Sequence, residues 1–99
     1  MPVQHIALIR FKPGTASAVM EDTFARLHQL RATIPGITAL TSGPNTSPEG
    51  LAQDHTHGFV MTFQDTAARD AYLPHPEHQQ FVQFAVPLIE KITVFDYES

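Results

Sequence analysis

The sequence predicts an α+β fold in which a four-stranded antiparallel sheet carries helices on one face. Four short segments rich in β-branched and aromatic residues alternate with segments whose apolar residues recur at helical spacing. Proline and glycine stand at several of the boundaries between them. The predicted order over the 99 residues is strand, helix, strand, strand, helix, helix, strand, which is the ferredoxin-like arrangement. A chain of this length forms one domain, residues 1–99.

The first strand and the first helix follow from the spacing of apolar residues. Residues 3–11 are largely apolar on both faces, which predicts a strand covered on both sides. Pro13–Gly14 ends this strand, and Thr15 can cap the helix that follows. Apolar residues then recur at helical spacing to about Thr33, at Met20, Phe24, Leu27, Leu30 and Ile34. Pro35–Gly36 predicts the end of this helix.

The middle of the chain predicts two more strands and a short helix. Residues 37–42 form the second strand, and residues 56–63 form the third. Between them, the polar and turn-rich residues 43–54 predict a surface loop. Asp65 can cap a short helix that extends to about Tyr72.

The last helix and the last strand complete the predicted fold. Pro76 suits the first turn of a helix, whose apolar residues are Phe81, Phe84, Ala85, Leu88 and Ile89. Pro87 is expected to kink or shorten this helix, and residues 92–97 form the final strand. Helices on one face leave the other face of the sheet bare. Because that face carries apolar residues such as Ile6 and Leu8, we expect two sheets to pair in a homodimer.

Composition and charge exclude several classes of function. Ten acidic against six scattered basic residues give a net charge of −4, which argues against nucleic acid or an anionic membrane as a partner. No apolar stretch approaches the roughly 20 residues that span a membrane. The absence of cysteine and of a signal-peptide pattern suits a cytoplasmic location.

Four polar side chains lie in segments that otherwise read as buried: His5, His57, Tyr72 and His78. If the odd-numbered faces of the first and third strands look toward the helices, these side chains can line one cavity for a small molecule. Each of them alone is also compatible with an ordinary hydrogen-bonded structural role. A zinc site built from His55, His57, His75 and His78 is the alternative. Without an HExxH run or a cysteine, we expect neither a metal nor a cofactor.

Four segments together resemble the stress-responsive dimeric α/β-barrel (Dabb) domain family. They are the strand that begins at His5 and ends at Phe11–Lys12, the stretch 56–59, the run Tyr-Leu-Pro-His-Pro-Glu-His at 72–78, and the ending Val-Phe-Asp-Tyr at 94–97. The resemblance covers nearly the whole chain and implies a ferredoxin-like α+β protomer that forms a homodimer whose two sheets close into a barrel. One member of the family is a plant polyketide cyclase that performs an intramolecular aldol condensation without a cofactor.

The resemblance also implies roles for the four residues. It gives His78 as the general base and Tyr72 as its hydrogen-bonding partner, which orients the substrate or stabilises an oxyanion. It gives His5 and His57 as polar groups that bind substrate. Loop 43–54 and the last helix have sequences of their own, so the substrate does not transfer. Three hypotheses therefore stand beside one another: a cofactor-free cyclase or lyase, a non-catalytic small-molecule binder associated with stress, and a dimer whose function is structural.

Overall fold

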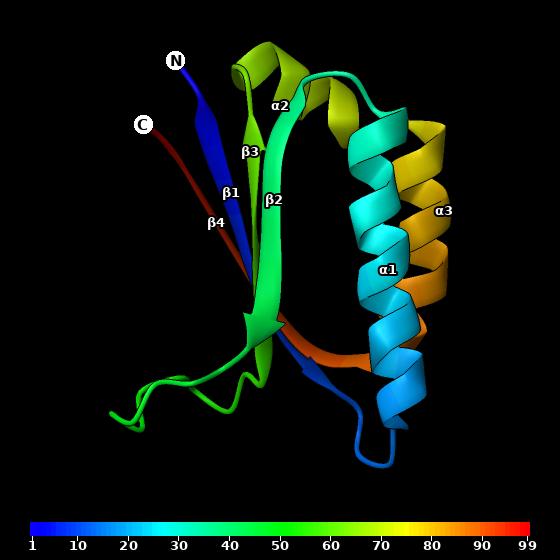
Figure 1. The fold of residues 1–99 in the computed structure, drawn as a ribbon, viewed down its shortest axis with the longest axis vertical. Coiled ribbons are helices and arrows are strands. Elements are labelled where there is room, and N and C mark those ends of the chain that lie inside the picture. The colour runs from blue at the N-terminus through cyan, green and yellow to red at the C-terminus, as the bar shows by residue number, and fades with distance from the viewer.

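The computed structural model describes residues 1–99 and has one four-stranded antiparallel sheet with its helices on one face (Figure 1). The order of strands across the sheet is β2-β3-β1-β4. The elements are β1 (Val3–Phe11), α1 (Ser17–Thr33), β2 (Ile37–Pro44), β3 (His57–Phe63), α2 (Thr66–Tyr72), α3 (Pro76–Ala85), the 3₁₀ turn η1 (Val86–Leu88) and β4 (Ile89–Glu98). The predicted ferredoxin-like order is thereby confirmed.

Several element boundaries differ from the sequence prediction: β2 extends to Pro44 instead of ending at residue 42, and β4 runs from Ile89 to Glu98 instead of over residues 92–97. Thr15 does not cap α1, because its hydroxyl donates to the Lys12 carbonyl at 2.7 Å and closes the preceding turn; Ala16 holds the cap position without a side-chain bond. As expected from Pro87, the last helix is shortened: it ends at Ala85, and Pro87 lies in the 3₁₀ turn that follows. Ile89 begins β4 and pairs with Phe11, although its spacing suggested the helix.

The core lies between the sheet and the helices. β1 pairs with β3 on one side and β4 on the other, and its odd-numbered residues are buried toward the helices. Figure 1 shows α1 and α3 side by side over this face, with α2 at one end of the sheet. The central buried cluster consists of Val3, Leu27, Leu30, Ile34, Ile37, Leu40, Met61, Phe63 and Tyr72. Side chains from five of the strands and helices thus exclude water together.

An N-terminal cap and a close approach to the start of β2 position α2. The Asp65 carboxylate accepts a hydrogen bond from the Ala68 amide at 2.8 Å and caps α2 as predicted. Gly36 precedes β2 with φ at 92°, and a Cβ built there would stand 2.6 Å from the Ala68 Cβ. Only glycine fits this close approach, which sets the position of the helix that carries Tyr72.

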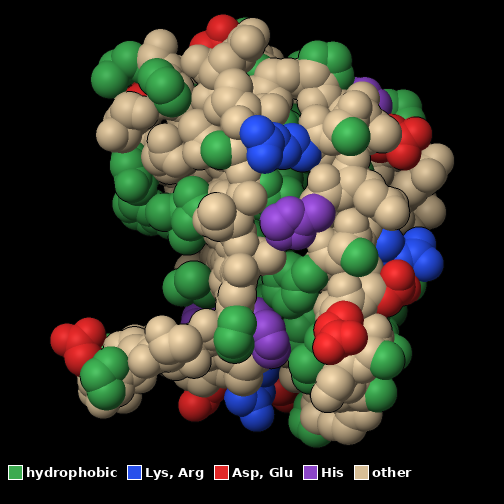
Figure 2. All heavy atoms as spheres, in the orientation of Figure 1, with side chains coloured by type: hydrophobic (Ala, Val, Ile, Leu, Met, Phe, Trp, Pro, Cys, Tyr) green, Lys and Arg blue, Asp and Glu red, His purple; other side chains and the backbone are tan.

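The face of the sheet opposite the helices is uncovered and apolar. Leu8, Val60, Phe95 and Tyr97 project from it, and all four are exposed. We call residues 45–56, between β2 and β3, the arm; it extends away from the body of the protein on this uncovered side (Figures 1 and 2). None of the helices is long and apolar enough to cross a membrane.

Candidate functional site

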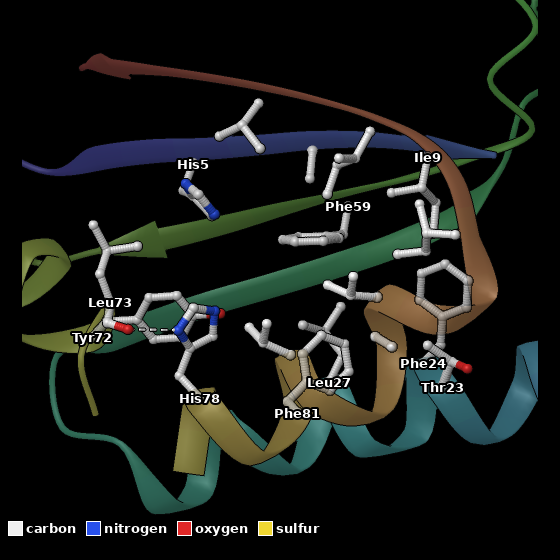
Figure 3. A pocket seen from close by; sticks show the side chains of 17 residues that line it. His5, Ile9, Thr23, Phe24, Leu27, Phe59, Tyr72, Leu73, His78 and Phe81 are labelled. Carbon is white, nitrogen blue, oxygen red and sulfur yellow. Dashed lines mark hydrogen bonds between the residues drawn. The ribbon is translucent and has the colours of Figure 1, made fainter. Parts of the chain in front are cut away.

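A cavity of about 220 Å³ lies between the sheet and helices α1 and α3. Fourteen of its 17 lining residues are hydrophobic, and none of them carries a permanent charge. The remaining three are His5, Thr23 and His78, and the Thr23 hydroxyl donates to the Val19 carbonyl of its own helix at 2.8 Å. In Figure 3, His5, Tyr72 and His78 gather at one end of the cavity and Phe24 lies at the other. The site therefore has a polar end and an apolar end.

Tyr72 and His78 form the polar end because a tight connection joins α2 to α3. Tyr72 is the last residue of α2, and His78 lies in the first turn of α3. Their rings stack with centroids 4.0 Å apart and a tilt of 34°. The resemblance implied a hydrogen bond between these two side chains, whereas the structure brings them together by stacking.

The hydrogen bond of His78 assigns its tautomer. His78 Nδ1 lies 3.0 Å from the Leu73 carbonyl oxygen, the contact drawn as a dashed line in Figure 3. Because a carbonyl can only accept, Nδ1 carries the proton and Nε2 keeps its lone pair. No protein group bonds to Nε2, so this nitrogen is available to a ligand in the cavity.

Burial shapes the proton chemistry of the same two residues. Burial lowers the pKa of His78 below its usual value of 6.5, although the hydrogen bond that His78 donates to the Leu73 carbonyl opposes this and nearby His5 and His75 add to it. His78 is therefore neutral at neutral pH and can accept a proton. Burial raises the pKa of Tyr72 far above its usual value of 10.0, so the hydroxyl stays protonated and can donate.

His5 lines the cavity as expected and has an ionic partner that the sequence did not single out. It is 8% exposed, and its Nδ1 lies 2.7 Å from Asp96 Oδ1. Asp96 stands opposite His5 in the register between β1 and β4, so the two side chains share the helix-facing side of the sheet. Its other oxygen accepts a bond from Arg69 Nη1 at 2.8 Å. A polar residue among the apolar residues of the last strand was the signal for Asp96.

His57 does not line this cavity, which corrects the expectation that four residues would share it. It faces the helices from the opposite end of the paired strands, and its ring packs against Phe11 at 5.4 Å and Phe24 at 5.6 Å between centroids. Phe24 itself lines the cavity and separates His57 from it. The imidazole also contacts the Thr56 hydroxyl at 2.9 Å.

The other histidines have structural partners. His55 Nδ1 donates to the Ala52 carbonyl at 2.7 Å, and its Nε2 accepts from the Thr93 hydroxyl at 2.9 Å, so it ties the arm to β4. His75 Nδ1 accepts from the Glu77 amide at 3.1 Å at the start of α3. No three of the His, Asp and Glu side chains come together as a metal-binding group, so the zinc alternative lacks a ligand set.

The fold and the cavity define a class of protein: a ferredoxin-like α+β domain with an apolar pocket and histidines at one end. Comparison with known proteins narrows this class. The sequence model of the Stress responsive A/B Barrel Domain (Dabb) family matches residues 3–99. The chain belongs to this family, as its motifs suggested.

Two curated relatives match nearly the whole length of this chain. Stress-response A/B barrel domain-containing protein HS1 of Arabidopsis thaliana is 32% identical over 98% of this chain and 89% of its own length. Olivetolic acid cyclase of Cannabis sativa is 27% identical over 98% of this chain and 96% of its own length.

Solved structures show the same fold. The Arabidopsis thaliana protein At3g17210 has a TM-score of 0.94 at 31% identity, covering 98% of this chain and 94% of its own. A dimeric ferredoxin-like protein of unknown function from Jannaschia sp. has a TM-score of 0.88 at 30% identity, with both chains covered completely. Hydroxynitrile lyase from Passiflora edulis has a TM-score of 0.91 at 26% identity, covering 97% of this chain and 91% of its own. Two relatives named here are thus enzymes, and one is described as dimeric.

Proposed function

We propose that this protein is a cofactor-free lyase or cyclase that moves a proton on a small, uncharged, largely apolar carbonyl compound. The observation that supports this most directly is the free Nε2 of His78 at the polar end of the cavity. A base needs a lone pair, a neutral state at working pH and a position beside the substrate. The bond to Leu73, the lowered pKa and the cavity supply these three requirements.

The reaction uses His78 and Tyr72 in complementary roles. His78 Nε2 takes a proton from the carbon between two carbonyl groups, and the Tyr72 hydroxyl donates a hydrogen bond to the enolate oxygen. The enolate carbon then attacks a second carbonyl of the same molecule and forms a carbon–carbon bond. The new alkoxide takes the proton back from His78, which returns the imidazole to its starting state.

The lining of the cavity supports the substrate class. No permanently charged side chain lines it, so an anionic head group would lose its hydration without compensation. Pockets for drug-sized ligands measure about 300–1,000 Å³, so a cavity of about 220 Å³ suits a smaller molecule with an apolar tail. Olivetolic acid cyclase and the hydroxynitrile lyase are relatives whose names fit this chemistry.

Turnover of a panel of β-polyketide thioesters and cyanohydrins tests the proposal. We expect His78→Ala to lower kcat by about 10²- to 10⁴-fold, the contribution of a general base. His28→Ala is the matched control, because His28 lies on α1 outside the cavity and bonds only to Ser42. Equal rates for wild type and His78→Ala on a compound that is turned over would refute the base assignment.

A non-catalytic binder is the second candidate, and the predominantly apolar lining of the cavity favours it. In that case the same compounds raise the melting temperature of the protein without being converted, and His78→Ala leaves their affinity nearly unchanged. Saturable binding with no turnover of any panel member would support the binder over the enzyme.

We further propose that the chain forms a homodimer through the uncovered face of the sheet. The exposed apolar side chains of this face support pairing, as does the dimeric state of the Jannaschia relative. Phe95→Asp places a charge on this face and is expected to give monomer in sedimentation. Ala18→Asp, at an exposed position of α1 on the other side of the sheet, is expected to leave the dimer intact. Wild type that sediments only as monomer at micromolar concentration refutes the proposal.

A further inference from the structure

A series of polar contacts connects Arg69 on α2, through Asp96 on β4, to the cavity-lining residue His5. Arg69 Nη1 donates to Asp96 Oδ2 at 2.8 Å, and Asp96 Oδ1 accepts from His5 Nδ1 at 2.7 Å. The three side chains come from α2, β4 and β1, and they are 24%, 21% and 10% exposed. They are therefore largely shielded from water, where such contacts hold their geometry better than on the surface.

The chemistry of these groups leaves the neutral form of His5 only one arrangement of protons. A guanidinium can only donate and an ionised carboxylate can only accept, so each Asp96 oxygen is bound to a different donor. His5 must then carry its proton on Nδ1. Its Nε2 keeps a lone pair and faces the cavity that His5 lines.

We infer that Arg69 is a positioning residue which, through Asp96, holds His5 with its Nε2 lone pair directed into the cavity. Asp96 alone would not be enough, because its strand β4 is exposed on both faces along most of its length. A carboxylate there can rotate and turn either oxygen toward water. Arg69 binds one oxygen and so directs the other toward His5.

Arg69 is itself held at a second point, which makes it a stable anchor. Its Nε donates to Asp70 Oδ1 at 2.8 Å while Nη1 reaches Asp96, so the planar guanidinium is fixed from both sides. The same helix carries Tyr72 one turn further on. A single helix therefore positions one wall of the polar end directly and His5 indirectly.

The cavity consequently offers two acceptors, Nε2 of His5 and Nε2 of His78, and one donor, the Tyr72 hydroxyl. This set matches a substrate that carries a hydroxyl or enol group as well as a carbonyl. The use of a fixed His5 for catalysis rests on the proposed function, whereas its tautomer does not depend on turnover.

The ¹⁵N chemical shifts of the His5 imidazole, measured by NMR at a pH above its titration, test this role. Wild type is expected to be protonated at Nδ1. In Asp96→Asn, the amide has one oxygen, which Arg69 claims, so its NH₂ group faces His5. The His5 proton should then move to Nε2, and the two nitrogen shifts should exchange. Adding Arg69→Met frees the amide to rotate and should restore protonation at Nδ1.

Two further variants complete the experiment. Asp70→Asn removes the charge of the other partner of Arg69 but keeps an oxygen that can accept from Nε, so it is expected to leave the His5 shifts unchanged, as a matched charge control. Should Asp96→Asn not fold, Arg69→Met alone replaces it and is expected to move the His5 resonances. Protonation at Nδ1 in Asp96→Asn while Arg69 is present overturns the inference, as do unchanged His5 shifts in Arg69→Met.

Discussion

Replacing Gly36 by alanine tests how α2, and with it Tyr72, is placed. Two costs add at this position. A φ of 92° strains any residue with a Cβ by about 1–2 kcal/mol, and the new methyl would lie 2.6 Å from the Ala68 Cβ. Relief of such a contact by a shift of α2 costs about 1–3 kcal/mol more. We therefore expect Gly36→Ala to lower the free energy of unfolding by about 2–5 kcal/mol.

Gly14 provides the matched control. Its φ is 83°, but no atom lies within 4 Å of a Cβ built there, so Gly14→Ala carries only the backbone cost of about 1–2 kcal/mol. Urea unfolding at one fixed protein concentration gives both values, because association would otherwise shift the midpoints. Equal losses for the two variants would refute the claim that contact with Ala68 sets the position of α2.

Four other variants test the packing and the titrating groups. Asp65→Ala removes the cap of α2 and should lower the free energy of unfolding by about 1 kcal/mol in urea. Leu27→Ala, in the core and on the cavity wall, should lower it by about 2–5 kcal/mol, whereas the exposed arm variant Leu51→Ala should change it by less than about 0.5 kcal/mol. Burial lowers the pKa of both His57 and His78, so below pH 6.5 the unfolded chain binds more protons and the fold loses stability. When pH falls through this range, the urea midpoint of His78→Gln should therefore decrease less than that of wild type. An equal decrease would contradict the lowered pKa of His78.

Most of the fold follows from local pattern, because exclusion of water acts on the side chains that periodicity groups together. The helical spacing of Phe24, Leu27 and Leu30 correctly predicts the buried face of α1. The end of α3 was harder to predict from the sequence, since Ile89 satisfies helical spacing and strand pairing equally well. Only its pairing with Phe11, far away in sequence, places it in β4.

The site was predictable to the extent that it is local. Tyr72 and His78 belong to one short segment, so their proximity follows from the turn between two helices. The place of His57 depends on the ring of Phe24, which comes from another element and closes the cavity in front of it. The contact between Asp96 and His5 spans 91 positions of sequence and requires the strand register.

The strand β4 presents alternate residues to two different environments. Ile92 and Val94 line the cavity, and Phe95 projects from the uncovered face. A ligand that orders this strand from the inside also orders the surface on which a second copy would pack. If ligand binding and the proposed dimer contact both order this strand, ligand affinity and subunit association are thermodynamically linked, and each strengthens the other by the same factor. Dilution would release ligand, and saturating ligand would lower the concentration at which dimers form.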